Sequence, residues 1–187
     1  AGSLQFLANG AWNKRLHPGL AARRAVEAVA LGAAGFRGAD RPLEGEFGFL
    51  RAYSDEPNPA AVDDVGDRSA VLETALKPYP CCRYTHPALD ALVELSDAVA
   101  PSAVDRIVVD LPSPGVRLTG DPIAAKRRPE NFVDCQFSMP FAAALALERG
   151  EAGLAAFRAA QDGLDDPGRR RLMDATEVVT TDAGGPL

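Results

Sequence analysis

Apolar residues recur at helical spacing in the first part of the chain. Between residues 20 and 35 they follow Pro18-Gly19 and stand three or four positions apart, which predicts a helix that stops at Gly35. The helix is rich in alanine, so a neighbouring helix could approach it closely. A second, short helix is expected within residues 42–54. Residues 54–67 are rich in Pro, Asp and Gly and predict an exposed loop.

The next part of the chain mixes helical and strand patterns. Thr85 as N-cap and Pro87 in the first turn predict a helix over residues 85–99. Residues 104–111 are β-branched and predict a strand, and residues 113–131 are expected to form a long loop. The buried stripe of the predicted helix consists of Leu89, Leu92, Val93 and Val99.

More helices and a final strand are expected after this loop. The helices are predicted at residues 137–150, 151–163 and 166–175. Ser138 is a candidate cap of the first of them and Gly150 closes it. Residues 176–182 predict the strand. Because helices and strands are mixed without a regular βαβ repeat, we expect an α+β fold in this part.

Composition and charge narrow the class of protein. The chain has 187 residues, of which 47% are hydrophobic and 25% charged, as in an ordinary globular protein. Its net charge of -6 and its pI of about 5.0 argue against nucleic acid as a partner, because phosphate binding needs a basic surface. No apolar run of ~18 residues occurs, so no membrane partner is expected either.

The cysteines and the first residues suggest the cellular compartment of the chain and its place in a longer protein. Cys81, Cys82 and Cys135 are an odd number with two of them adjacent, which does not indicate a disulfide framework. With no signal peptide at the start, the reducing cytoplasm is the expected compartment. The chain begins AGSLQFLANG, without an initiator methionine, and we expect it to be an internal segment of a longer protein.

The stretch KPYPCCRYTH, residues 77–86, concentrates candidate chemistry. Adjacent side chains diverge in a regular backbone and no second ligand pair is present, so Cys81, Cys82 and His86 do not predict a metal site. A redox pair would need Cys-x-x-Cys. On chemistry alone the thiols are best interpreted as small buried side chains in a tight turn. Lys77 could bind a substrate carboxylate or equally be an exposed lysine.

A second candidate is NKRLHPG, residues 13–19, ahead of the alanine-rich helix. A helix N-terminus favours anions and Lys14 adds to that field, which would suit a carboxylate or a phosphate. The alternative is a solvated basic turn in which His17 caps or packs, and spacing alone favours this alternative.

Other polar residues are interpreted as structural. Lys126, Arg127 and Arg128 are assigned to a solvated loop, and Ser138 to a helix cap, since no Gly-x-Ser-x-Gly surrounds it. No dinucleotide or P-loop glycine pattern occurs, and no cofactor is expected.

Four segments, taken together, resemble one family. They are NKRLHPGLAARRAVEAVALGAAGF, LEGEFGFLRAYS, LKPYPCCRYTHPALDAL and CQFSMPFAAALALERG, and they span most of the chain. In this order and spacing they resemble the MmgE/PrpD family, which includes 2-methylcitrate dehydratase, cis-aconitate decarboxylase and iminodisuccinate epimerase. The resemblance implies a large all-helical domain, a smaller α+β lid domain, an active site in the cleft between them, and a homodimer.

The resemblance also implies a division of this chain. Residues 1–70 match the C-terminal part of the helical domain and residues 71–187 match the lid. The earlier part of the helical domain, which supplies an aspartate and histidines of the family's active site, has no counterpart here.

The family's site residues carry over position by position. Lys14 and His17 match the lysine and histidine of a Lys-x-Leu-His-x-Gly segment, and Lys77 matches the lysine that opens the lid loop. Cys82 stands where the decarboxylase branch has a catalytic histidine, which argues against a cis-aconitate decarboxylase. The tyrosine that some members present has no counterpart near residues 116–118. The expected catalytic residues are Lys14, Lys77 and Cys82, and the expected substrate-binding residues are His17, Cys81 and His86.

The activity that the resemblance implies is a lyase or isomerase reaction on a small di- or tricarboxylate. The shared first step removes a proton next to a carboxylate, and 2-methylcitrate dehydratase is the leading model. One alternative is an epimerase of the iminodisuccinate type, for which the cysteine at position 82 is mild support. The other is a non-catalytic fragment that acts only by association.

Overall fold

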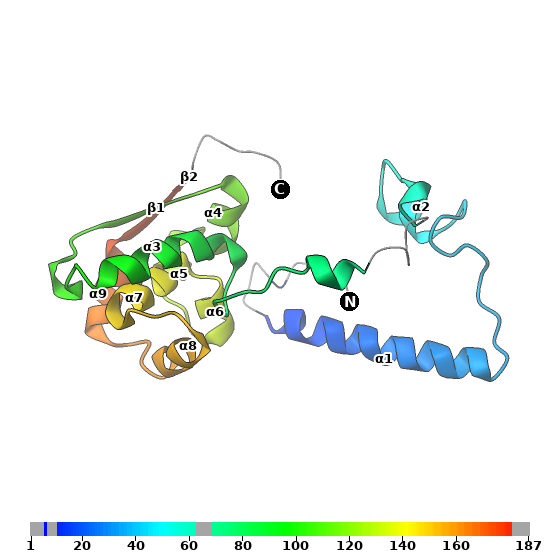
Figure 1. Cartoon of the computed structure of the whole chain (residues 1–187), viewed down its shortest axis with the longest axis horizontal. Coiled ribbons are helices and arrows are strands. Elements are labelled where there is room, and N and C mark those ends of the chain that lie inside the picture. Colours follow the sequence, from blue (N-terminus) through cyan, green and yellow to red (C-terminus); the bar gives the residue numbers. More distant parts are fainter. Residues whose placement is uncertain (1–5, 7–10, 63–68, 181–187) are drawn as a thin grey trace. The chain divides into compact units, whose positions relative to one another are not determined.

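The computed structural model describes residue 6, residues 11–62 and residues 69–180, without the side chains of residues 61, 62 and 70. The chain divides into two compact units (Figure 1). We call residues 13–76 the helical unit and residues 77–180 the C-terminal unit. Each has its own internal contacts, and each is described by itself.

The helical unit is dominated by α1 (Asn13–Ala33). The predicted helix is confirmed, but its predicted start is wrong, since α1 begins at Asn13 and continues through Pro18. Proline fixes φ at a helical value and removes only its own N–H donor, so the helix can pass through it with one hydrogen bond fewer. At the other end Gly35 has φ 91°, and its N–H donates to the Gly32 carbonyl at 3.0 Å. Gly35 therefore ends α1 as predicted.

The rest of the helical unit consists of short elements. They are α2 (Phe49–Tyr53) and the 3₁₀ helices η2 (Pro59–Val62) and η3 (Ala70–Glu73). The short helix expected within residues 42–54 is thus present as α2. Of the loop predicted at residues 54–67, residues 63–67 lie outside the described part of the chain.

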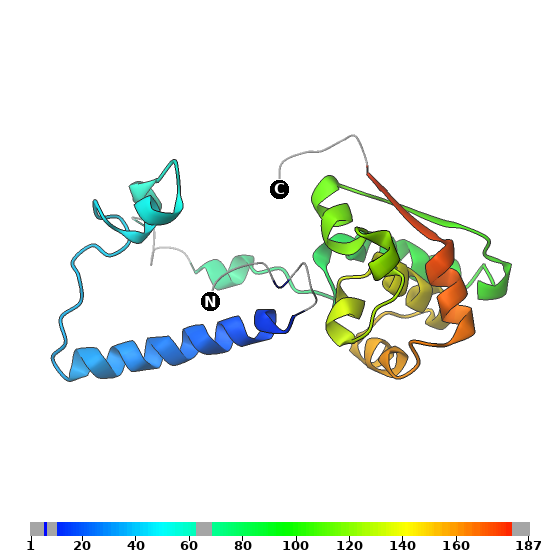
Figure 2. The same cartoon turned by 180° about the vertical axis from the view of Figure 1, so that it is seen from behind.

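The C-terminal unit packs seven α-helices and two 3₁₀ helices with a two-stranded sheet in its described residues (Figure 2). In chain order they are η4 (Arg83–Thr85), α3 (His86–Ser96), η5 (Pro101–Ala103), β1 (Ile107–Leu111), α4 (Ser113–Thr119), α5 (Ile123–Lys126), α6 (Phe132–Gln136), α7 (Met139–Arg149), α8 (Leu154–Gln161), α9 (Pro167–Ala175) and β2 (Thr176–Thr180). β1 and β2 pair in parallel, with Ile107 opposite Thr176 and Leu111 opposite Thr180. The expected α+β class is confirmed.

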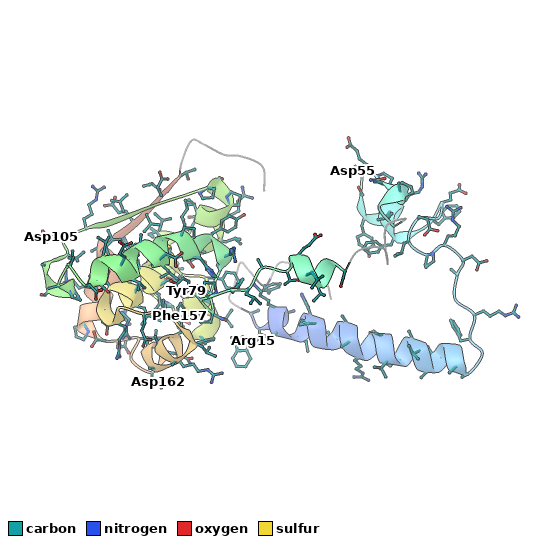
Figure 3. All side chains as sticks on the ribbon, in the orientation of Figure 1. Arg15, Asp55, Tyr79, Asp105, Phe157 and Asp162 are labelled. Carbon is teal, nitrogen blue, oxygen red and sulfur yellow. The ribbon has the colours of Figure 1, made fainter. Side chains whose placement is uncertain are left out.

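The core of this unit is built around α7. Its residues from Met139 to Leu147 are all buried, and it packs against α3 and α9. Ser138 accepts a hydrogen bond from the Phe141 N–H at 3.0 Å, and Gly150 closes the helix with φ 66°. Both predicted end residues are confirmed. Phe141 meets Phe157 of α8 edge to face, with ring centroids 5.5 Å apart, and Figure 3 labels Phe157.

A buried arginine links helices α7, α8 and α9. The Arg169 side chain of α9 is 3% exposed and pairs with Glu148 of α7 through two hydrogen bonds of 2.9 Å. Its Nη1 also donates to the carbonyls of Ala160 at 2.9 Å and Gly163 at 2.6 Å. A buried charge is stable only when it is paired and hydrogen-bonded, and here every branch of the guanidinium has an acceptor.

Two predictions for this unit are wrong. The loop expected over residues 113–131 contains α4 and α5, because Pro114 and the Pro122–Ile123 step start helical turns after extended residues. Thr85 occupies the N-cap position of α3 but its hydroxyl makes no cap bond there; it donates to the Cys82 carbonyl at 2.8 Å instead.

The three cations placed in a solvated loop are also structural. Lys126 Nζ donates to the Leu118 carbonyl at 2.8 Å. Arg127 donates twice to the Thr176 carbonyl, at 2.6 and 3.2 Å, and Arg128 pairs with Asp174 of α9 through bonds of 2.7 and 2.9 Å. The segment after α5 is thereby tied to α4, α9 and β2, which the local sequence pattern could not indicate.

The remaining predictions largely agree with the structure. Helices α8 and α9 and strands β1 and β2 lie within the predicted segments, and residues 181–182 of the last one lie outside the described residues. Leu89 and Leu92 are buried, while Val93 packs partly buried against the core. Among the described helices none combines the length and the apolar character needed to cross a bilayer.

Candidate functional site

The segment from Lys77 to His86 is a rigidly held turn. Pro78 and Pro80 fix φ at two of its positions. The Cys82 N–H donates to the Gln136 carbonyl at 2.9 Å, and the Gln136 side-chain amide donates back to the Pro80 carbonyl. Two hydrogen bonds in opposite directions therefore hold this turn against the end of α6.

Lys77 opens the turn. Its side chain is exposed, and its Nζ donates to the Cys81 carbonyl at 3.0 Å. This bond folds the side chain back along the turn, so that the ammonium lies beside the two cysteines. The ammonium has three N–H donors and this is the one hydrogen bond it makes within the described residues. It could therefore also bind an anion.

Cys81 is a protonated thiol. Thr85 uses its single hydroxyl proton for the Cys82 carbonyl, so the contact of 3.1 Å between Cys81 Sγ and Thr85 Oγ1 is donated by the thiol. Burial raises the pKa of Cys81 to about 11, and this outweighs the hydrogen bond to Thr85, which lowers it. Cys81 is therefore unsuited to act as a base near neutral pH, but it can line a site.

Cys82 is buried at the centre of the turn. Its N–H bonds to Gln136, and its carbonyl accepts both the N–H and the hydroxyl of Thr85, at 3.0 and 2.8 Å. The backbone N–H and the carbonyl of Cys82 are thus both hydrogen-bonded. A proton-transfer group benefits from such fixed placement, because the distance to the reacting atom is then set by the fold.

His86 begins α3 and is 4% exposed. Its ring meets that of Tyr79 edge to face with centroids 5.3 Å apart, and neither ring nitrogen has a well-formed hydrogen bond to a described residue. Burial lowers the pKa of His86, and the charges of Lys77 and Arg83 act in the same direction against Asp90 and the Cys81 backbone. The imidazole is therefore neutral at physiological pH, with one ring nitrogen as donor and the other as acceptor.

Tyr79 and Asp90 support this histidine, and no sequence pattern indicated either residue. The Tyr79 hydroxyl, labelled in Figure 3, donates to Asp90 Oδ1 at 2.5 Å. That hydrogen bond, with burial and the carboxylate charge, raises the pKa of Tyr79 to about 12. The ring that packs on His86 is thereby anchored to α3. The two residues stand 11 apart with no motif linking them, so only the tertiary structure could bring them together.

The other two predicted site residues belong to the helical unit. Lys14 and His17 are the second and fifth residues of α1, so they share one face of its first turns rather than preceding the helix. Lys14 is exposed and His17 is partly buried. Arg15, labelled in Figure 3, lies between them in sequence. The structure thus gathers Lys77, Cys81, Cys82 and His86 in one unit and Lys14 and His17 in the other, and the assigned roles of all six stay predictions.

The chain's cysteines are free in the described residues, and no cluster of three or more His, Cys, Asp or Glu side chains in that part could hold a metal ion. What the turn offers is an ammonium, two thiols and a neutral imidazole within ten residues. Such a set can bind carboxylates and move protons.

Comparison with known proteins identifies the family. Residues 1–61 match the MmgE/PrpD N-terminal domain and residues 79–184 match the MmgE/PrpD C-terminal domain. A comparison with curated proteins found no match. The second of these models covers the candidate turn from Tyr79 onward, and the first covers Lys14 and His17. The chain therefore belongs to the MmgE/PrpD family.

Proposed function

We propose that this protein is a lyase or isomerase that removes a proton α to a carboxylate of a small di- or tricarboxylate, with 2-methylcitrate dehydratase as the leading model. One observation carries the proposal. In a chain that belongs to the MmgE/PrpD family, the turn from Lys77 to His86 presents an ammonium, a buried thiol and a neutral imidazole on a fixed backbone.

The two predicted lysines have complementary tasks. Removing a proton next to a carboxylate leaves negative charge on the carboxylate oxygens, and a nearby ammonium stabilises that charge as it develops. Lys77 and Lys14 are each proposed to hold a carboxylate of the substrate. His17, Cys81 and His86 would complete the binding surface, with Cys81 as a thiol donor and His86 as a neutral imidazole.

Cys82 is the proposed proton-transfer group. As a thiolate it would accept the α-proton, and as a thiol it would return one to the carbanion. Return of the proton by Cys82 to the same face gives exchange, whereas inversion needs a second group that delivers a proton to the opposite face. The cysteine at this position is the observation that favours an iminodisuccinate-type epimerase as the second candidate, because thiols can serve as the acid and base in such inversions.

Association is a further part of the proposal. Several large apolar side chains of the helical unit are exposed in the described residues, and burying them between two copies would support a homodimer. A non-catalytic piece that acts only by association would use the same surface. The free thiols suit a cytoplasmic location, and the proposed reaction needs no cofactor.

The test is solvent exchange at the α-carbon. The protein encoded by the whole gene is incubated in D₂O with 2-methylcitrate, citrate and succinate, and loss of the α-proton signal is followed by NMR. Lys77→Met should reduce exchange about 100-fold or more, since one preorganised charge contributes roughly this much. Arg158→Met, which removes an exposed charge from α8, is the control. No exchange with any di- or tricarboxylate would refute the proposal, and full turnover in Cys82→Ser would remove Cys82 from it.

A further inference from the structure

Lysine is rare in this chain. It occurs at three positions, Lys14, Lys77 and Lys126, so 17 of the 20 basic residues are arginine. A guanidinium serves for surface charge and for bidentate pairing, whereas lysine supplies a compact ammonium that can point at a single oxygen. Two of the three lysines already belong to the predicted site. The third was assigned to a solvated loop, which the structure contradicts.

Lys126 ends α5 in a partly buried position. Its Nζ donates to the Leu118 carbonyl at 2.8 Å, and its own carbonyl accepts a hydrogen bond from Ser138 Oγ. No carboxylate of the described residues lies within ion-pair distance of the ammonium. As in Lys77, one N–H of the ammonium forms a hydrogen bond, and no carboxylate in the described part of the chain pairs with the charge. The ammonium can therefore bind an anion.

The backbone brings Lys126 to the cysteine turn. Cys82 N–H donates to Gln136, and Ser138, two residues further on, donates to Lys126. Residues 136–138, at the junction of α6 and α7, therefore bond the backbone of both Cys82 and Lys126. Electrostatics agree with this placement: burial lowers the pKa of Lys126, and the charges of Asp134, Cys82 and Asp121 partly raise it again.

Neither Asp134 nor Asp121 forms an ion pair with the Lys126 ammonium within the described residues. Asp134 Oδ2 accepts from Asn131 Nδ2 at 2.8 Å and from the Glu130 N–H at 3.2 Å, which commits it to the start of α6. Asp121 is exposed. The charges of both act to raise the pKa of Lys126 against the larger lowering effect of burial. Lys77 belongs to the same turn as Cys82, and its Nζ donates to the Cys81 carbonyl at 3.0 Å.

We propose that Lys126 and Lys77 bind two carboxylate groups of one substrate molecule next to Cys82, so that the C-terminal unit by itself distinguishes di- and tricarboxylates from monocarboxylates. This inference rests on the proposed function and adds to it a residue and a selectivity. Lys14 is then left to hold a further carboxylate or to stabilise the charge formed when the proton leaves.

The experiment compares two unreactive probes, propane-1,2,3-tricarboxylate and butyrate, by NMR titration of the whole protein. Lys126→Met should weaken tricarboxylate binding about tenfold or more, the usual effect of losing one charged hydrogen bond, and leave butyrate binding within about twofold. Lys126→Arg should restore part of the loss. Arg158→Met should change neither affinity, which controls for net charge.

A structural role for Lys126, as a simple partner of the Leu118 carbonyl, gives a different result. In that case Lys126→Met would weaken the binding of both probes equally and would also lower the melting temperature. That outcome overturns the inference. Unchanged selectivity overturns it as well. If wild-type protein catalyses α-proton exchange while Lys126→Met keeps its selectivity, only the role of Lys126 is refuted. If wild-type protein binds neither probe and shows no exchange, the proposed function falls with it.

Discussion

Helices α1 and α7 are built from similar residues and have opposite environments. α1 has 21 residues, many of them alanine, and none is buried, whereas nine of the 11 residues of α7 are buried. The last turns of α1, residues 28–33, carry no charged side chain on any face. A helix that is apolar all round is suited to burial. Composition thus indicates that a helix is suited to burial, but packing against neighbouring elements determines whether it is buried.

The same contrast holds for the two units. In the C-terminal unit Phe141, Phe157 and Leu145 are fully buried around α7. In the helical unit Val29 of α1 is 73% exposed and Phe47 is 94% exposed. Burial of apolar surface is the main favourable term in folding, so the C-terminal unit should carry most of the stability of the chain. Paired substitutions can test this difference.

The largest difference is expected for core truncations. Phe157→Ala should lower the free energy of unfolding by about 3–5 kcal/mol, because it leaves a cavity against Phe141 and α7. Val29→Ala should change it by less than about 0.5 kcal/mol, since little apolar surface is lost and alanine is the better helix former. Urea unfolding followed by circular dichroism measures both. A loss above about 2 kcal/mol for Val29→Ala would mean that α1 is covered, as in a dimer.

The cost of breaking an ion pair should differ between the two units nearly as much as the cost of a core truncation. Arg169→Met leaves Glu148 without its buried partner and should cost about 3 kcal/mol. Arg23→Met breaks the pair of Arg23 with Glu27 on α1, which is exposed to solvent, and should cost less than about 0.5 kcal/mol. Adding Glu148→Gln to Arg169→Met should recover part of the loss. Equal costs for the two arginines would contradict the difference between the units.

Alkaline pH should weaken the C-terminal unit alone. Burial raises the pKa of Cys81 from 9.0 to about 11 and that of Cys135 from 9.0 to about 12, so the unfolded chain loses these protons first. Stability is then fully present below pH 9 and falls as the pH rises toward the folded values, by about 4 kcal/mol between pH 8 and 10.5 for the two thiols together. Thermal unfolding across this range measures the fall, and Cys81→Ser should make it less steep. A flat profile would show that the thiols are not buried.

The smallest effect concerns the two glycines that end helices. Gly150 and Gly35 both have positive φ, 66° and 91°, and alanine should cost about 1 kcal/mol at either. At Gly150 the added methyl group also meets Ser96 Oγ at 3.1 Å, so Gly150→Ala should lower the melting temperature of the C-terminal unit. Gly35→Ala should only fray the end of α1 and leave that melting temperature unchanged. Calorimetry of both variants distinguishes the two results.

Local sequence is enough to predict the features that depend on residues a few positions apart. Ser138 and Gly150 bound α7, and Gly35 ends α1, because capping and left-handed conformations are local. The six candidate site residues came from two short segments whose order matches the family. Lys77, Cys81, Cys82 and His86 lie together because they are close in the chain.

Other features depend on contacts between residues far apart in the chain, and the sequence pattern does not predict them. β1 and β2 pair in parallel across 64 intervening residues, from Leu111 to Thr176. Gln136 fixes the backbone of the cysteine turn, Asp90 anchors Tyr79 beside His86, and Ser138 links Lys126 to the same place. A hydrogen bond between residues far apart leaves no periodic trace in the sequence, because its partners are chosen by the fold and not by spacing. For this reason Lys126 looked like part of a solvated loop until its contacts were known.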